Sequence, residues 1–430
     1  MKSNDDSVEL VDCKSLRIGM YVELDVGWLS HPFSTGNFKL TSSRQIDTIR
    51  GLDLERVRVN FAKSDPAPDE VPPKPVTDAV AQERARAAVD QRDAVLRQQH
   101  AEQLALQERN LLACERRFGD AVRQYKKMLD ALPTQPKAAA EHCHTLVSSF
   151  VGDMLCEGDC AIRLLSEAAG DKSSMHPVNV TVVSLLLGKA MGLSAADLTD
   201  LGMAAFLHDV GKAQLPDRVR WLEENFSTAE YKLYQEHVAR SVQVGQSMEL
   251  SRGALLAIAQ HHELADGSGF PSRVKGESMT VGARILALVN RYDNFCNPSR
   301  PATAMTPHES LSLIFAQLKT RFDTVALSAF IRMIGVYPPG SVVQLIDDRY
   351  GLVVSVNSSR PLKPRIIVFE PGIARHEALI LDLEQSPRIG IRRSLKPSAL
   401  PGAALDFLAP RQRVSYFFER VVDSQMGPPA

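Results

Sequence analysis

Two runs decide the fold of this chain: His208-Asp209-Val210-Gly211-Lys212 and His261-His262-Glu263-Leu264-Ala265-Asp266-Gly267-Ser268-Gly269-Phe270-Pro271. Each follows an apolar stretch with helical composition, and residues 178–191 are mostly apolar as well. Side chains that can bind metal therefore stand at the ends of apolar helices, where they can converge. We predict an all-α bundle for residues 136–335.

Helix starts can be read on both sides of the first run. Ser194 precedes Asp197 by three residues, and Ser227 precedes Glu230 in the same way, a spacing typical of capping boxes. Gly211 is placed to close the helix that ends near His208.

The last helix that concerns the site is expected over residues 281–295. It places Leu286, Asn290 and Asp293 on one face, at positions i, i+4 and i+7.

The order of these residues is similar to that of the HD-GYP domain family. Residues 175–300 contain in sequence the elements of that pattern: His176, His208-Asp209, Lys212, His237, His261-His262 and the loop 266–271. The resemblance implies a mainly α, HD-type helical bundle. It also implies a cytoplasmic, metal-dependent phosphodiesterase that hydrolyses the bacterial second messenger cyclic di-GMP to pGpG or GMP.

The same resemblance implies two divalent metal ions, iron or manganese, which imidazole and carboxylate ligands suit. The first metal would be held by His176, His208, Asp209 and residue 290, and the second by Asp209, His237, His261 and His262. A two-metal site of this kind can supply a hydroxide nucleophile and neutralise phosphodiester oxygens.

Substrate contacts are implied as well. Asp209 and Lys212 are expected to be catalytic, with Lys212 gripping a phosphate oxygen. The other expected contacts are Asp266, Gly267, Gly269, Phe270 and Arg300. Two of these are glycines, which allow a ligand to approach the backbone closely.

Four positions depart from the family pattern. Asn290 stands where an aspartate ligand is expected, so the first metal should bind more weakly. Phe270 replaces the tyrosine of the name motif, Lys172 stands where some relatives have a third-metal glutamate, and Thr303 replaces a basic residue that would accompany Arg300. Asp293, one turn beyond Asn290, is the substitute ligand that the helix offers, although about 60° away around the axis.

These departures leave three functions open. The first is an active cyclic di-GMP phosphodiesterase that tolerates Asn290. The second is a catalytically degenerate receptor for cyclic di-GMP, or a protein-interaction scaffold. The third is a general HD phosphohydrolase, which the run from His261 to Pro271 disfavours.

Three further segments surround the bundle. Residues 8–65 have alternating apolar patterns at 17–22 and 56–61 that predict a small β-containing module, and residues 16–22 and 28–33 resemble a module found before some HD-GYP domains. Residues 66–135 combine a proline-rich linker with a long charged helix over 77–132, which is expected either to pair in a homodimer or to stay solvated. Residues 336–430 are expected to form a small β-rich unit.

The composition limits the partners. The 430 residues carry 50 Lys and Arg against 51 Asp and Glu, a net charge of −1, which predicts no nucleic-acid partner. The absence of a long apolar run predicts no membrane partner, and six dispersed cysteines suit a reducing cytoplasm. Signalling proteins are expected as further partners, beside cyclic di-GMP and a second copy of the chain.

Overall fold

The computed structural model describes residues 8–24, 33, 35–52, 54–66, 78–156, 160–166, 172–221, 226–357 and 360–420. The chain divides into two compact units, Met1–Asp93 and Ala94–Ala430. Most of the predicted proline-rich linker and of the 28–33 motif lies outside the described residues. Among the residues that are described, no helix combines the length and the apolarity needed to cross a bilayer.

The first unit contains a four-stranded antiparallel sheet in the order β1-β4-β2-β3. Its strands are β1 (Val8–Asp12), β2 (Tyr21–Glu23), β3 (Asn37–Lys39) and β4 (Arg56–Asn60), and its helix is α1 (Ser43–Arg50). The second predicted strand is present as β4. The first is shorter than predicted, because Gly19 adopts a φ of 93° and the extended chain resumes only at Tyr21.

Two helices precede the bundle: α2 (Asp78–Ala131) and α3 (Pro136–Leu155). From Cys114 onward α2 has an apolar face, including Phe118 and Tyr125, that is buried in the main core. Val95 and Leu106, earlier in the same helix, are exposed. Homodimerisation through this helix stays a prediction.

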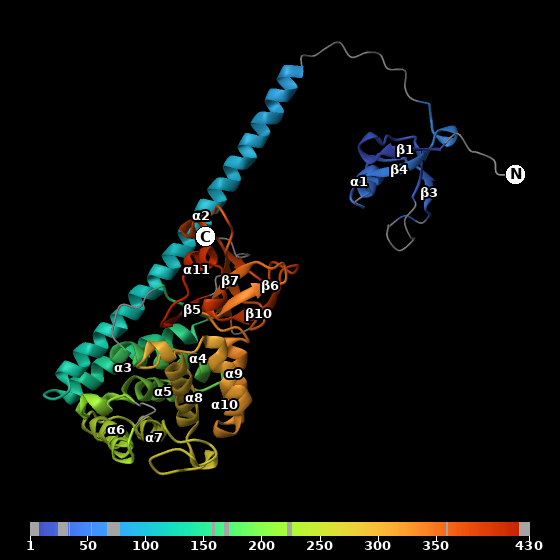
Figure 1. The fold of residues 1–430 in the computed structure, drawn as a ribbon. Coiled ribbons are helices and arrows are strands. Elements are labelled where there is room, and N and C mark those ends of the chain that lie inside the picture. Colours follow the sequence, from blue (N-terminus) through green and yellow to red (C-terminus); the bar gives the residue numbers. More distant parts are fainter. Residues whose placement is uncertain are drawn as a thin grey trace. The chain divides into compact units, whose positions relative to one another are not determined.

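The central bundle is formed by the helices between residues 172 and 334 (Figure 1). They are α4 (Lys172–Ala190), α5 (Ala195–Leu207), α6 (Thr228–Ser247), α7 (Arg252–Gln260), α8 (Val281–Cys296), α9 (Pro307–Gln317) and α10 (Thr324–Ile334). The predicted starts are confirmed: Ser194 Oγ accepts from the Asp197 amide, and Ser227 forms a capping box with Glu230. The helical bundle predicted within residues 136–335 is therefore present, but the strand Cys160–Leu164 in this range shows that the all-α expectation was wrong.

A seven-stranded sheet lies at one end of this bundle (Figure 1). Its strands are β5 (Cys160–Leu164), β6 (Val342–Leu345), β7 (Tyr350–Asn357), β8 (Arg365–Val368), β9 (Ile380–Asp382), β10 (Ile391–Leu395) and β11 (Tyr416–Arg420), and α11 (Gly402–Leu408) accompanies them. The three strands predicted after residue 336 are present as β6, β7 and β8. However, β5 comes from before the bundle and pairs with both β7 and β11.

Helices and sheet share one hydrophobic core. Phe150 of α3 packs edge-on against Phe417 of β11, with ring centroids 5.5 Å apart. The buried residues of the bundle and of the sheet belong to the same cluster. The β-rich segment is thus packed as part of the second unit.

Gly211 does not close a helix, as the sequence suggested. The helix α5 ends at Leu207, and Gly211 lies in a 3₁₀ helix, Val210–Gln214, that packs on α6. A Cβ at this position would lie 2.4 Å from the His237 carbonyl oxygen and 2.5 Å from the Ser241 amide nitrogen. The glycine is required by close backbone approach rather than by a turn.

Replacing Gly211 by alanine is expected to force the 3₁₀ helix away from α6. We expect Gly211→Ala to lower the free energy of unfolding by about 3 kcal/mol, because the clash is with backbone that cannot rotate away. Thermal unfolding followed by circular dichroism measures this.

Gly152→Ala is the matched control, since Gly152 lies in α3 and its Cβ would meet nothing within 4 Å. This change should stabilise the helix by about 0.5–1 kcal/mol. Equal midpoints for the two variants would contradict the packing described here.

Candidate metal centre and its pocket

Three histidines of the bundle are held in one way by the backbone. His208, His237 and His261 each lie 2.5–2.8 Å, through Nδ1, from the carbonyl oxygen three residues earlier. A carbonyl oxygen only accepts, so each Nδ1 carries the proton and donates it. Each Nε2 is therefore left with a lone pair, which is the form that binds a metal.

His176 carries its proton on Nδ1 as well, but here the acceptor is a carboxylate. It lies in the first turns of α4, and its Nδ1 donates to Asp293 Oδ2 of α8 at 2.5 Å. Its Nε2 lies 3.2 Å from His208 Nε2 and 3.5 Å from Asp209 Oδ2. His176, His208 and Asp209 thus form a first group of buried side chains that could hold a metal ion.

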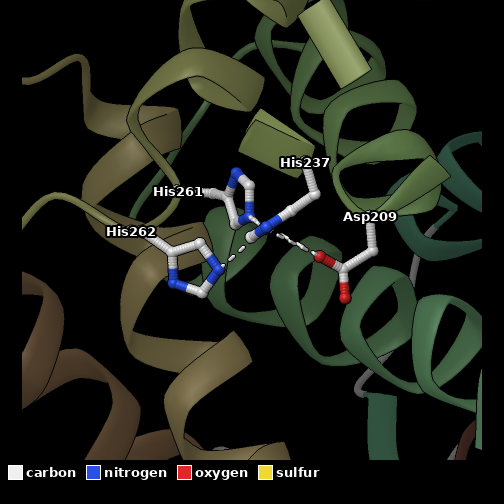
Figure 2. A group of neighbouring side chains, drawn as sticks. All are labelled: Asp209, His237, His261 and His262. Atoms are coloured by element: carbon white, nitrogen blue, oxygen red, sulfur yellow. Dashed lines mark hydrogen bonds and ion pairs between the residues drawn. The ribbon is translucent and has the colours of Figure 1, made fainter. Parts of the chain in front are cut away.

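A second group shares Asp209 with the first (Figure 2). Asp209 Oδ1 lies 3.5 Å from His237 Nε2 and 3.7 Å from His261 Nε2. His262 Nε2 lies 3.1 Å from His237 Nε2. The two carboxylate oxygens are divided, with Oδ2 toward the first group and Oδ1 toward the second.

This arrangement of lone pairs is electrostatically unfavourable unless a cation lies between the atoms. The pairs His176–His208 and His237–His261 bring two lone-pair nitrogens within 3.2 and 3.3 Å with no proton between them. Asp209 Oδ1 is buried and has no hydrogen-bond partner in the described part of the chain. Imidazole nitrogens and a carboxylate oxygen at these separations fit divalent metal ions.

Burial favours the neutral form of four of the imidazoles. It lowers the pKa of His176 and His261 and holds the pKa of His237 and His262 well below the ordinary value. Neutral rings keep the lone pairs that ligands need.

Asp209 also contacts Lys212, whose Nζ lies 2.6 Å from Oδ2. Burial opposes ionisation of both groups, but their mutual attraction prevails: the pKa of Asp209 is held well below its usual range and the pKa of Lys212 is raised. The ammonium also lies over the rings of Trp221 and Tyr234, 5.2 and 5.4 Å from their centroids. The charged lysine is thus fixed beside the ligand groups.

A pocket of about 720 Å³ opens over this centre. Its wall includes five of the predicted site residues near one another: Lys212, Gly269, Phe270, Asn290 and Arg300, together with the ligands His261 and His262. Sequence reasoning missed other wall residues, including three aromatic rings and two cations: Trp221, Tyr231, Tyr234, Arg291 and Arg321. No motif marks them, since aromatic and basic residues are common on helices.

Two predicted substrate contacts lie outside that wall. Asp266 Oδ1 accepts from the Ser268 amide and hydroxyl at 2.9 and 2.6 Å, so its carboxylate folds the loop. Gly267 supplies a φ of 78° to the same turn. Gly269 does line the pocket, and a Cβ there would lie 2.5 Å or less from backbone atoms of Glu263 and Leu264.

Glu263 holds the far end of this loop and was given no role from sequence. Its side chain is fully buried, and its two carboxylate oxygens accept from the amides of Ser272, Arg273 and Val274 at 2.6, 3.1 and 3.2 Å. Phe270, within the loop, stacks on the His262 ring at 4.5 Å with an interplanar angle of 21°. The loop thereby fixes a ligand histidine.

Asn290 and Asp293 differ in their surroundings. Asn290 is buried in the pocket wall, and its Oδ1 accepts from Asn294 Nδ2 at 2.7 Å. Asp293 uses Oδ2 to bind the Nδ1 side of His176, away from the metal-facing Nε2. Asp293 thus orients a ligand in this structure, while a ligand role for Asn290 stays a prediction.

The chain is similar to known proteins over most of its length. Residues 162–325 match a family model described as an HD domain, and residues 10–143 match one described as a domain of unknown function (DUF3391). A cyclic di-GMP phosphodiesterase of Pseudomonas aeruginosa is 27% identical over 369 residues, which cover 82% of this chain and 83% of that protein. The predicted resemblance and the HD-type fold class are confirmed.

Two further relatives share a shorter stretch. A cyclic di-GMP phosphodiesterase response regulator of Xanthomonas campestris pv. campestris is 31% identical over 153 residues, 35% of this chain and 40% of the relative. A 3'3'-cGAMP-specific phosphodiesterase of Vibrio cholerae is 25% identical over 184 residues, 42% of this chain and 40% of the relative. A solved HDG"Y"P protein from Bdellovibrio bacteriovorus aligns over 75% of this chain and 98% of its own, with 13% identity and a TM-score of 0.40.

The shared carboxylate generates a test by metal analysis. We expect the wild-type chain to bind two divalent ions, His237→Ala to lose one, and Asp209→Ala to lose both, because only Asp209 belongs to both groups. Metal per chain, measured by mass spectrometry after dialysis against iron or manganese, reports this. Two ions retained by Asp209→Ala would contradict the grouping.

Proposed function

We propose that this chain is a metal-dependent phosphodiesterase that hydrolyses cyclic di-GMP to pGpG or GMP. The premise is that residues 162–325 are an HD domain of the HD-GYP type. The observation that carries the proposal is the pair of ligand groups sharing Asp209 beneath a pocket that also holds Lys212. The relatives named as cyclic di-GMP phosphodiesterases support the choice of substrate.

The ligands fit two metal ions. His176, His208 and Asp209 would hold the first, with Asn290 as a neutral addition, and Asp209, His237, His261 and His262 would hold the second. Nitrogen-rich sites with one carboxylate suit iron or manganese. When bound, such ions supply an activated water as nucleophile and neutralise charge on the phosphodiester oxygens.

The protein's own groups bind and orient the substrate. Lys212, charged and fixed by Asp209, is placed to hold a phosphate oxygen, and Arg291, Arg300 and Arg321 line the same pocket. A cyclic dinucleotide carries two phosphates, which four cations can match.

Aromatic rings cover the rest of the wall. Tyr231, Tyr234, Phe270 and Phe295 offer faces on which nucleobases can stack, and a base stacked on an aromatic ring is worth about 1–3 kcal/mol. The pocket volume of about 720 Å³ lies in the range of small-molecule sites. The four cations, the aromatic rings and the volume of the pocket together support a dinucleotide ligand.

Hydrolysis is tested on anaerobically purified protein whose metal content is known. We expect conversion of cyclic di-GMP to pGpG or GMP, lost on chelation, and turnover reduced by about 10²-fold in Lys212→Ala because a phosphate contact is removed. Lys137→Ala, at a surface ion pair with Glu249, is the control and should match wild type.

The outcome is read by liquid chromatography, with 3'3'-cGAMP assayed in parallel. Protein that holds two metals and yields no product from cyclic di-GMP would overturn the proposed reaction. Faster turnover of 3'3'-cGAMP would move the proposal to that substrate.

A second test concerns the position where the family pattern has an aspartate. We expect Asn290→Asp to tighten binding of the first metal by about tenfold or more and to raise turnover, because a charged ligand replaces a neutral one. Ser299→Asp is the control, since it adds the same charge to the same pocket wall and leaves the Asn294 side chain that donates to residue 290 unchanged. Equal effects of the two changes would show that residue 290 is not a ligand.

A further inference from the structure

The carboxylate that holds His176 is itself held by two buried amides. Asp293 Oδ1 accepts from Asn179 Nδ2 at 3.1 Å and from Asn297 Nδ2 at 2.9 Å, while Oδ2 accepts from His176. The relative exposures of Asp293, Asn179 and Asn297 are 3, 1 and 6%. All three hydrogen bonds are therefore shielded from water.

Both amides also bind the backbone just before and at the start of β11. Asn297 pairs with both polar groups of Val414, donating from Nδ2 to its oxygen and accepting its N–H at Oδ1, each at 2.9 Å. Asn179 donates to the same oxygen and accepts from the Tyr416 amide, also at 2.9 Å each. The two side chains thus take the place of a neighbouring strand along this segment.

This bonding fixes which way each amide points. Each Nδ2 gives one hydrogen to Asp293 and the other to Val414 O, so both are used. A flipped amide would set its oxygen against a carboxylate and a carbonyl, with no proton to share. The segment 414–416 therefore determines the orientation of the donors that face Asp293.

We propose that Asn179 and Asn297 are positioning residues through which the C-terminal strand completes the metal centre. They hold Asp293, and Asp293 sets the tautomer and the ring orientation of His176, so that Nε2 faces His208 and Asp209. This inference rests on the metal centre of the proposed function and is independent of its substrate. It gives the C-terminal sheet a role in the site, in addition to its share of the hydrophobic core.

The competing explanation is that the two amides only stabilise the fold. Removing either would leave buried backbone N–H groups unpaired, which costs about 1–3 kcal/mol each whatever the effect on metal. The two explanations differ in what happens to the first metal alone, because the His237, His261 and His262 side chains make no hydrogen bond with Asp293 among the described contacts.

The experiment measures metal affinity by chelator competition in the full chain. We expect Asn179→Ala and Asn297→Ala to weaken binding of one ion by about 10- to 100-fold and to leave the other unchanged, as happens when partners of a ligand are removed. Asp293→Asn should do the same, because its one oxygen would accept from the two Nδ2 donors and its NH₂ group would face His176 Nδ1, which would lose its acceptor.

Tyr416→Phe is the matched control. It removes a buried hydroxyl that donates to Pro339 O at 3.1 Å from the same strand, without touching Asp293. It should lower the thermal midpoint as the asparagine changes do, yet keep both ions. Should Asn297→Ala give no folded protein, Asn297→Ser carries the same comparison.

A double variant decides whether the amides act through Asp293. Adding Asn297→Ala to Asp293→Asn should cause no further loss of affinity, since the effect passes through a residue already changed. Additive losses, unchanged affinity in both asparagine variants, or an equal loss in Tyr416→Phe would each overturn the proposal. A wild-type chain that binds no divalent ion would overturn the metal centre itself, which is a different result.

Discussion

The structure depends on one electrostatic constraint: lone pairs from several neutral imidazoles are held close together, beside a carboxylate, in a buried place. Such an arrangement is unfavourable without a cation, so each ring must be prevented from turning away. His208, His237 and His261 are fixed by carbonyl oxygens of their own helical turns. The helices supply these bonds without any additional residue.

His176 is the exception, and the consequences extend through the chain. It lies near the start of α4, where its Nδ1 meets α8 rather than a carbonyl of its own turn. Holding it takes a carboxylate from α8, the Asn179 amide of α4, the Asn297 amide just after α8, and backbone before and at the start of β11. The first ligand group thus depends on residues distant in sequence, whereas the His237 and His261 rings of the second are oriented within their own turns.

This difference explains what could be predicted from sequence. The capping residues Ser194 and Ser227 act locally, and the histidines occur in an order that a family pattern records, so helices and ligands could both be predicted. The contact of Gly211 with α6, the buried role of Glu263 and the pairing of β5 with β11 are set by packing between distant segments. No local spacing indicates them. For Asp293, the face of the helix was predicted from the sequence, but its hydrogen-bond partner His176 was not.

Because Asp209 belongs to both ligand groups, the two groups depend on one residue. Lys212 and the first group meet Oδ2, and the second group meets Oδ1. Loss of this one carboxylate is therefore expected to disable both groups, whereas loss of a histidine that belongs to one group leaves the other group intact.

The link between Asn179 and Val414 has a consequence for the order in which the protein is made. The two residues are 235 positions apart, and a chain emerges from the ribosome starting at its N-terminus. All the histidine ligands are therefore synthesised long before the segment that orients Asp293 exists. The nascent helical bundle can gather its histidines early, but its first metal group reaches its final geometry only after residue 416 has been added.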